Sequence, residues 1–387
     1  MTAFDPQQAT FQRALSALQS GNGKDAERLL KTVLRAQPRH LAALNLLGII
    51  LTQLGQFTEA EIYLRRALRE NPRSDATLYN YGIVLKALNR PEEALDRFSA
   101  ALAINSGIAE TWNNRGTVLN DLGRHQDAIA DFERAIGLNV RYADAYCNKG
   151  RSLANLKRFA EALSAFDAAL ALQPRLAEAW CGRGEACCAL ERYHDAAAAC
   201  EKALALRPDF AEARLGTGNV LARLDRYDDA LAAYDRALAL QPGLAEAWLG
   251  RGNVYGALKR YDEALAAYDK ALALKGNLVE AWFGRGNLCF ERGQHRDALA
   301  AYERALTQKP DYAEAWHARG HVFFANGQYA AALGAYDKAA TLKPELEYVA
   351  SSRLSAKLHM SDWSNLDAEA AACLAAIRAG KLASTPF

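Results

Sequence analysis

The sequence predicts an all-α protein, an α-solenoid of ten helix–turn–helix repeats followed by C-terminal capping and linker helices. A unit of 34 residues runs ten times from Gln7 to Leu346 without insertion or deletion, starting at residues 7, 41, 75, 109, 143, 177, 211, 245, 279 and 313. Position 20 of the unit is alanine in every copy, and position 8 is glycine in every copy but the first. Since each unit buries its apolar face only against its neighbours, such a chain presents a long surface and is not built around one catalytic cleft.

Each unit divides into two predicted helices. Positions 4, 8 and 11 fall on one face of helix A, and positions 20, 24 and 27 fall on one face of helix B. In the eighth unit these positions hold Trp248, Gly252, Tyr255, Ala264, Tyr268 and Ala271. Proline at position 32 in seven units ends helix B, because proline has no N–H to donate. The small residues allow helices A and B to approach closely, and the aromatic residue at position 4 fills the remaining space.

The two ends of the chain depart from the period. We expect residues 1–6 to form a lead-in, with Asp5 as an N-cap and Pro6 at the first helical position. Residues 347–387 predict a capping helix at about 347–359 and a second helix at about 364–379, opened by Ser364. The sequence thus divides into a lead-in, ten tandem repeats over residues 7–346, and a tail of capping helix and linker.

A 34-residue helix–turn–helix with aromatic, glycine, alanine, aromatic, alanine and proline at these positions resembles the tetratricopeptide repeat (TPR) family over residues 7–346. Unit 1 departs most, with Thr10, Ala14 and Val33 at signature positions, as a terminal repeat often does. The resemblance implies a right-handed superhelix whose concave groove is lined by helix A and holds an extended peptide.

Asparagine recurs at the helix A positions that we predict to face this groove, namely positions 2, 5, 6, 9, 12 and 13. The two runs are Asn80, Asn114 and Asn148 at position 6 of units 3 to 5, and Asn219, Asn253 and Asn287 at position 9 of units 7 to 9. A carboxamide offers both donors and an acceptor, so it can pair with an extended backbone whatever the peptide sequence. We therefore predict that these six residues bind protein or peptide; the alternative is an ordinary solvated helix face.

Three further patterns concern helix A. Glycine at position 6 of units 6 to 9 (Gly182, Gly216, Gly250 and Gly284) indicates a need for space and predicts a more open second half of the groove, because glycine costs ~1 kcal/mol relative to alanine inside a helix. Position 2 is acidic in seven consecutive units, which complements the helix macrodipole or gives a weak preference for basic ligands. We expect the basic residues at position 7 to pair with acidic residues at position 19, such as Asp127, Glu161 and Glu263.

Composition argues against several functions. The net charge of +2, with acids and bases interspersed, argues against nucleic acid or an anionic membrane as a partner. No apolar run spans a bilayer, and the N-terminus resembles no signal peptide. Seven cysteines without disulfide or metal spacing fit a reducing, cytoplasmic setting. In unit 6 we interpret Cys187 and Cys200 as small core residues rather than zinc ligands. No catalytic arrangement stands apart from the repeat, so we predict no enzyme activity, cofactor or metal.

The tail carries a second resemblance. His359-Met360-Ser361-Asp362-Trp363-Ser364, followed by an amphipathic helix, resembles the junction between the TPR arm and the catalytic region of protein O-GlcNAc transferases, including their bacterial and plant SPINDLY-like relatives. Ser361 stands where that family has cysteine. The resemblance implies a substrate-recognition arm without its catalytic domain, which transfers nothing from UDP-GlcNAc by itself. The alternative is a stand-alone cytosolic scaffold or adaptor, and the sequence also allows a homodimer through the convex face.

Overall fold

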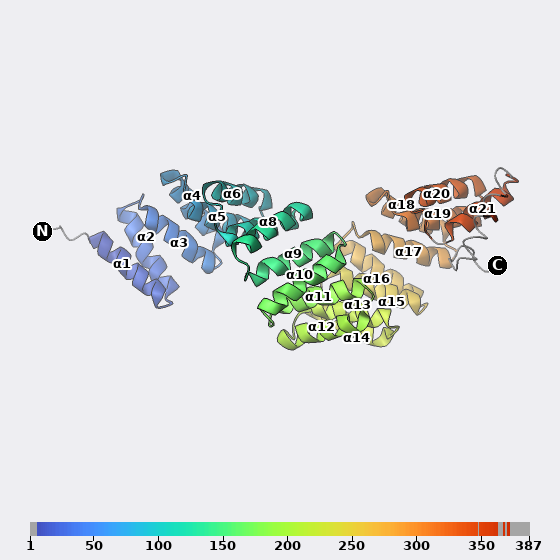
Figure 1. The fold of residues 1–387 in the computed structure, drawn as a ribbon, viewed down its shortest axis with the longest axis horizontal. Coiled ribbons are helices and arrows are strands. Elements are labelled where there is room, and N and C mark those ends of the chain that lie inside the picture. The colour runs from blue at the N-terminus through green and yellow to red at the C-terminus, as the bar shows by residue number, and fades with distance from the viewer. Residues whose placement is uncertain (1–5, 347, 363–366, 368–369, 372–387) are drawn as a thin grey trace. The chain divides into compact units, whose positions relative to one another are not determined.

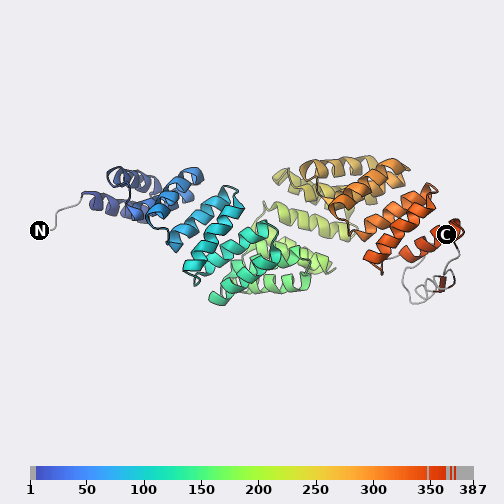
Figure 2. The same ribbon diagram turned by 90° about the horizontal axis from the view of Figure 1, so that it is seen from above.

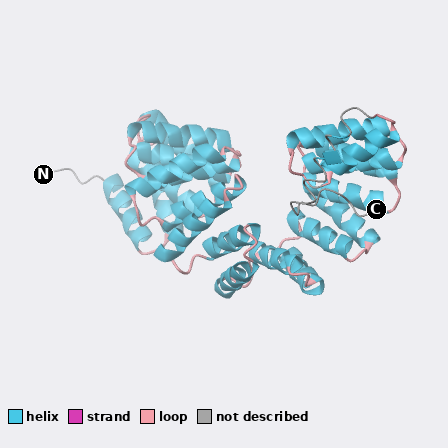
Figure 3. Ribbon diagram, turned by 45° about the vertical axis from the view of Figure 1, so that its right-hand side comes forward, coloured by secondary structure: helices cyan, strands magenta, loops and turns pink. Residues whose placement is uncertain are grey.

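The computed structural model describes residues 6–346, 348–362, 367 and 370–371. In this part of the chain every regular element is a helix, and Figure 3 shows helices and loops with no strand. The prediction of an all-helical repeat fold is confirmed. The predicted second tail helix, Trp363 and Asp5 lie outside the described residues, apart from residues 367 and 370–371 of that helix.

Each repeat folds into the two predicted helices, with helix A over positions 1–13, or from Pro6 in repeat 1, and helix B over positions 17–30. In repeat 4, for example, α7 (Ala109–Asp121) is helix A and α8 (His125–Leu138) is helix B. The turn between them needs one left-handed residue at position 15, and glycine supplies it without strain in repeats such as repeat 4, where Gly123 has φ +74°. The odd-numbered helices up to α19 are therefore A helices, and the even-numbered helices up to α20 are B helices.

The chain forms two compact units, Met1–Leu206 and Arg207–Phe387. The helices, labelled in Figure 1, follow one another as neighbouring pairs within each unit, and Figure 2 shows the same pairs from above. Besides α7 and α8, the first unit contains α1 (Pro6–Gln19), α2 (Gly23–Ala36), α3 (Leu41–Gln53), α4 (Phe57–Glu70), α5 (Asp75–Ala87), α6 (Pro91–Ile104), α9 (Ala143–Asn155), α10 (Phe159–Leu172), α11 (Ala177–Ala189) and α12 (Tyr193–Leu206). The second unit contains α13 (Ala211–Arg223), α14 (Tyr227–Leu240), α15 (Ala245–Ala257), α16 (Tyr261–Leu274), α17 (Val279–Glu291), α18 (His295–Gln308), α19 (Ala313–Ala325), α20 (Tyr329–Leu342) and α21 (Val349–His359).

In repeats 5, 7 and 8 the aromatic side chain at position 24 of helix B is held between two glycines. A Cβ atom added to Gly218, at position 8 of the same repeat, would lie 2.5 Å from the Tyr234 ring. A Cβ added to Gly250, at position 6 of the next repeat, would also lie 2.5 Å from that ring. Phe166 lies between Gly150 and Gly182 in the same way. The ring thus packs against helix A of its own repeat and helix A of the next one.

This packing corrects the prediction of a more open second half of the groove. The space left by Gly182, Gly250 and Gly284 is occupied by the aromatic ring of the preceding repeat. Glycine is needed there because any Cβ would overlap a buried ring, a requirement that outweighs its low helix propensity.

In repeats 4, 6 and 8 the tryptophan at position 4 lies between two cationic side chains. The guanidinium carbons of Arg115 and Arg134 each lie 4.7 Å from the ring centroid of Trp112, and the Trp112 indole N–H donates to the Ser106 carbonyl at 2.8 Å. Trp248 is held in the same way by Arg251 at 4.7 Å and Lys270 at 4.2 Å. Position 7 therefore contributes a cation–π contact that fixes the position 4 ring against helix B.

The expected pairing of position 7 with position 19 is wrong. Arg115 instead forms a bidentate ion pair with the buried carboxylate of Asp131 at position 23, both distances being 2.7 Å. The acids at position 19 pair with the arginine three residues earlier, at position 16, because that arginine precedes helix B and lies on the same face. These pairs include Arg124–Asp127, Arg158–Glu161 and Arg260–Glu263, at 2.6–2.8 Å, and they are exposed and contribute little to stability.

Candidate functional site on the helix A face

Consecutive A helices lie side by side. In the first unit α3, α5, α7, α9 and α11 each contact the next, and in the second unit α13, α15, α17 and α19 do so. The side chains at positions 6 and 9 of successive repeats are therefore arranged in rows along each unit. We call this surface the helix A face.

In the second unit, each predicted asparagine is bonded to a buried tyrosine of its own repeat. The hydroxyl groups of Tyr234, Tyr268 and Tyr302 donate to the carboxamide oxygens of Asn219, Asn253 and Asn287 at 2.9, 2.8 and 2.7 Å, respectively. Burial raises the pKa of the Tyr268 and Tyr302 phenols, so each hydroxyl keeps the proton that it donates. The hydrogen bond fixes which way the carboxamide is turned.

The amide N–H groups of this row point away from the tyrosines. Within the described chain no residue accepts a hydrogen bond from Asn219, Asn253 or Asn287, and the first two of these side chains are exposed. Because the oxygen of each carboxamide is occupied, the group that remains available is a donor. The second unit thus presents three N–H donors, one from each of three consecutive repeats.

In the first unit the asparagines use their amide N–H groups in hydrogen bonds and leave their oxygens available, the reverse of the second unit. The amide nitrogens of Asn80, Asn114 and Asn148 donate to the Ala76 carbonyl, the Tyr79 hydroxyl and the Asn113 carboxamide oxygen, at 2.9, 2.9 and 3.0 Å. No residue of the described chain donates to the carboxamide oxygens of these three asparagines, which leaves three side-chain acceptors. The structure therefore places each predicted set of three on one unit, with one type of hydrogen-bonding group available in each.

Position 9 holds a charged residue in repeats 5 and 6, namely Arg151 and Glu185. Desolvation by the surrounding helices raises the pKa of the Glu185 carboxyl, and the nearby Arg151 charge opposes this shift. Burial also raises the pKa of the Cys147 thiol to about 12, so this cysteine stays protonated and unreactive.

The acidic residues at position 2 are partly neutralised. Lys275 pairs with Glu246, and Lys343 pairs with Glu314, both at 2.9 Å. Burial acts to raise the pKa of the Glu246 carboxyl, but the hydrogen bond and charge of Lys275, together with a backbone hydrogen bond, outweigh it and lower the pKa. These lysines follow helix B at position 31 and reach the A helix of the same repeat. The acidic row accordingly gives only a limited preference for basic ligands.

The cysteines of repeat 6 belong to the core. Cys187 and Cys200 are buried, and the Cys200 sulfur lies where other repeats have an aromatic ring, next to Gly184. No group of three or more histidine, cysteine, aspartate or glutamate side chains suited to a metal occurs among the described residues. The interpretation of these cysteines as small core residues is confirmed. In the same part of the chain, no helix is long and apolar enough to cross a membrane.

Comparison with protein families identifies the repeat. Family models described as tetratricopeptide repeat match residues 11–75, 109–142, 147–211, 188–245, 215–278 and 313–346, and a model described as TPR repeat matches residues 286–327. The chain belongs to the tetratricopeptide repeat family, whose members generally act as protein-interaction scaffolds.

Solved structures resemble the chain at low sequence identity. A tetratricopeptide repeat protein from Parabacteroides merdae is 20% identical, with a TM-score of 0.54 over 64% of this chain and 98% of that one. Yeast Tom70 is 14% identical over 92% of this chain and 96% of its own, with a TM-score of 0.49. Cut9-Hcn1, an APC/C hetero-tetramer, is 15% identical over 93% of this chain and 91% of that one, with a TM-score of 0.47. At 20% identity the Parabacteroides merdae structure supports the fold alone. No curated protein matches the chain.

Proposed function

We propose that the chain is a protein-binding module that holds an extended segment of its partner along the helix A face. The main support is the set of tyrosine–asparagine hydrogen bonds in the second unit, since they orient three carboxamides so that the N–H groups remain available. An extended peptide backbone carries carbonyl oxygens that accept such bonds irrespective of side-chain sequence. The carboxamide oxygens in the first unit complement backbone N–H groups in the same way.

Replacing the three asparagines by aspartate tests this proposal without disturbing the core. In the variant Asn219→Asp, Asn253→Asp, Asn287→Asp, a carboxylate oxygen still accepts the tyrosine hydroxyl, but the N–H donors are lost. The probe is a peptide selected from a random library against the natural chain. At about 1 kcal/mol for each lost hydrogen bond, we expect the Kd of this peptide to rise roughly 100-fold.

The control is Gln241→Glu, Asn277→Asp, Gln328→Glu, three exposed side chains outside the A helices whose replacement adds the same negative charge. This variant should leave the affinity within a few-fold of the natural chain. Equal loss in both variants would mean that general charge, and not the oriented carboxamides, controls binding. Unchanged affinity in the aspartate variant would rule out these asparagines as a peptide site.

For the biological setting, we propose the substrate-recognition arm of a protein O-GlcNAc transferase. The support is the resemblance of residues 359–364 to the junction of those enzymes, together with the asparagine rows. The catalytic residues would then lie beyond Phe387. Incubation of this chain with UDP-GlcNAc and acceptor proteins should give no sugar transfer.

The second candidate is a scaffold or adaptor for assembling protein complexes, which membership of the tetratricopeptide repeat family favours by itself. Sequencing the gene past the Phe387 codon separates the two settings. A frame that continues into a glycosyltransferase domain supports the recognition arm, and a stop codon supports the adaptor. The peptide-binding experiment bears on both, because each requires the helix A face.

A further inference from the structure

A polar pocket of about 350 Å³ lies in the first unit, lined by residues of α4, α5 and α6. Four arginines line it: Arg65 and Arg69 from one side of α4, Arg97 from α6, and Arg90, which immediately precedes α6. The B helices supply most of this surface, so the asparagine rows of the A helices take no part in it.

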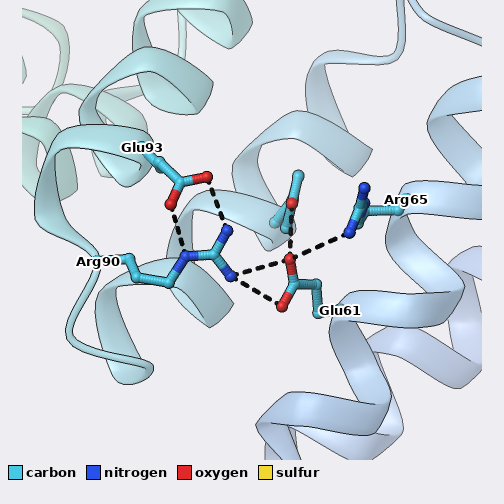
Figure 4. Close-up of polar contacts among 5 residues, drawn as sticks. Glu61, Arg65, Arg90 and Glu93 are labelled. Carbon is cyan, nitrogen blue, oxygen red and sulfur yellow. Dashed lines mark hydrogen bonds and ion pairs between the residues drawn. The ribbon is translucent and has the colours of Figure 1, made fainter.

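Arg90 forms hydrogen bonds with both carboxylates at the pocket, those of Glu61 and Glu93, as Figure 4 shows. The Arg90 guanidinium donates to both oxygens of Glu93, at 2.6 and 2.7 Å, and to both oxygens of Glu61, at 3.0 and 2.9 Å. The Tyr81 hydroxyl donates to the same Glu61 at 3.0 Å. One arginine and one tyrosine thus satisfy two acidic side chains that would otherwise compete for the remaining cations.

Three guanidinium groups are left over. Arg65 makes only one long contact, 3.9 Å to Glu61, and its side chain is 59% exposed. Arg69 and Arg97 form no hydrogen bond or ion pair with any residue of the described chain. The Arg90 hydrogen bonds, aided by the charges of Arg97 and Arg65, lower the pKa of Glu93. The positive charge of the pocket therefore exceeds its negative charge by two, counting four arginines against Glu61 and Glu93.

We propose that this arginine pocket binds a phosphorylated side chain of a protein partner. Guanidinium groups bind phosphate oxygens through parallel N–H bonds, and a phosphate monoester carries about two negative charges at neutral pH, which matches the excess of two positive charges. The volume exceeds that of a bare phosphate group and leaves room for the side chain that carries it. Leu68 and the Tyr81 ring provide apolar contacts for that side chain.

A protein ligand fits better than nucleic acid. A nucleic-acid surface needs a continuous track of cations along several phosphates, whereas this chain has a net charge of only +2 with acids and bases interspersed. The arginine pocket is one concentrated site. It is suited to a single phosphate group presented by a peptide.

Isothermal titration calorimetry with nonapeptides tests this proposal. One peptide has a central phosphoserine flanked by alanine and glycine, a second has serine in its place, and inorganic phosphate serves as competitor, all at 150 mM NaCl. We expect the phosphoserine peptide to bind at one site, at least tenfold more tightly than the serine peptide, and inorganic phosphate to displace it. Equal affinity for the two peptides would overturn the proposal.

The variant Arg69→Gln, Arg97→Gln should weaken phosphopeptide binding at least tenfold. The matched control, Arg236→Gln, Arg304→Gln, removes the same charge from exposed positions on α14 and α18 and should change the affinity less than twofold. Because neither Arg69 nor Arg97 forms a hydrogen bond or ion pair in the described chain, the midpoint of thermal unfolding should change little, which separates loss of binding from loss of fold. Equal weakening by both variants, or tighter binding of a single-stranded oligonucleotide than of the phosphopeptide, would contradict the assignment.

Discussion

The aromatic residue at position 24 determines what its neighbours can be. Tyr234 is buried between Gly218 and Gly250, and its hydroxyl needs a hydrogen-bond acceptor because an unpaired buried hydroxyl is costly. Asn219 supplies that acceptor. Gly218, Gly250 and Asn219 thus all contact one ring. The same ring aims the amide N–H group that we propose binds a peptide.

Two glycines of α15 make this packing testable. A Cβ at Gly250 would overlap Tyr234 at 2.5 Å, whereas a Cβ at Gly256 would first meet Leu288 at 3.6 Å, an ordinary contact. We expect Gly250→Ala to lower the free energy of unfolding by roughly 1–3 kcal/mol through overpacking. Gly256→Ala should instead raise it by up to ~1 kcal/mol, because alanine favours the helix. Urea unfolding of the two variants checks this, and a shift of both in the same direction would refute the packing.

Part of this residue-level detail is readable in the sequence. Repeats 7 to 9, which have tyrosine at position 24, have asparagine at position 9, while repeats 3 to 5 have phenylalanine and place asparagine at position 6. That correlation by itself indicates a bond between the tyrosine and the asparagine. The direction in which each carboxamide turns is not readable, because it depends on which atom of its partner lies within hydrogen-bond distance.

At the scale of elements, the last repeat differs from the others in carrying histidines on α19. His317 Nε2 lies 3.0 Å from the Ser352 hydroxyl on α21, and His321 Nδ1 lies 3.3 Å from the Tyr336 hydroxyl on α20. The centroids of the two imidazole rings lie 4.4 Å apart. These contacts join the three final helices, so the protonation of the histidines affects how α21 covers the last repeat.

Acid should loosen this end of the chain. Burial, together with the neighbouring His321, lowers the pKa of His317 to about 4, and burial lowers the pKa of His321. Their pKa in the unfolded chain is about 6.5, so as the pH falls from 6.5 towards 4 the unfolded chain binds protons that the folded chain does not. The stability that the neutral histidines contribute is therefore fully present above about pH 6.5 and is lost as the pH falls from 6.5 towards 4.

The variant His317→Leu, His321→Asn isolates this effect, because leucine and asparagine occupy the same positions in repeats 7 and 8 and the asparagine can still accept from Tyr336. We expect the midpoint of thermal unfolding, followed by circular dichroism, to fall less between pH 7.5 and pH 5 in this variant than in the natural chain. An identical fall in both would show that other groups carry the acid sensitivity.

At the scale of the whole molecule, the 34-residue period was sufficient to predict the fold, because every repeat supplies the same two helices and the same contacts to its neighbour. The arginine pairs were less predictable. Arg115 pairs with Asp131, whereas Asp127 pairs with Arg124, and the residue types alone do not tell which acid each arginine meets. The arginine pocket could also not be predicted from the sequence, since it depends on Arg90 forming hydrogen bonds with the carboxylates of both Glu93 and Glu61.

Photo-cross-linking from matched positions on the two helices of the repeat tests the central claim most directly. Ala257 and Ala325 are exposed on A helices, while Ala266 and Ala300 are exposed on B helices of the same unit. Benzoylphenylalanine introduced at each site, in the presence of a library-selected peptide, should form a covalent adduct from Ala257 and Ala325 and little or none from Ala266 and Ala300. Adducts from the B-helix positions alone would contradict a peptide site on the helix A face.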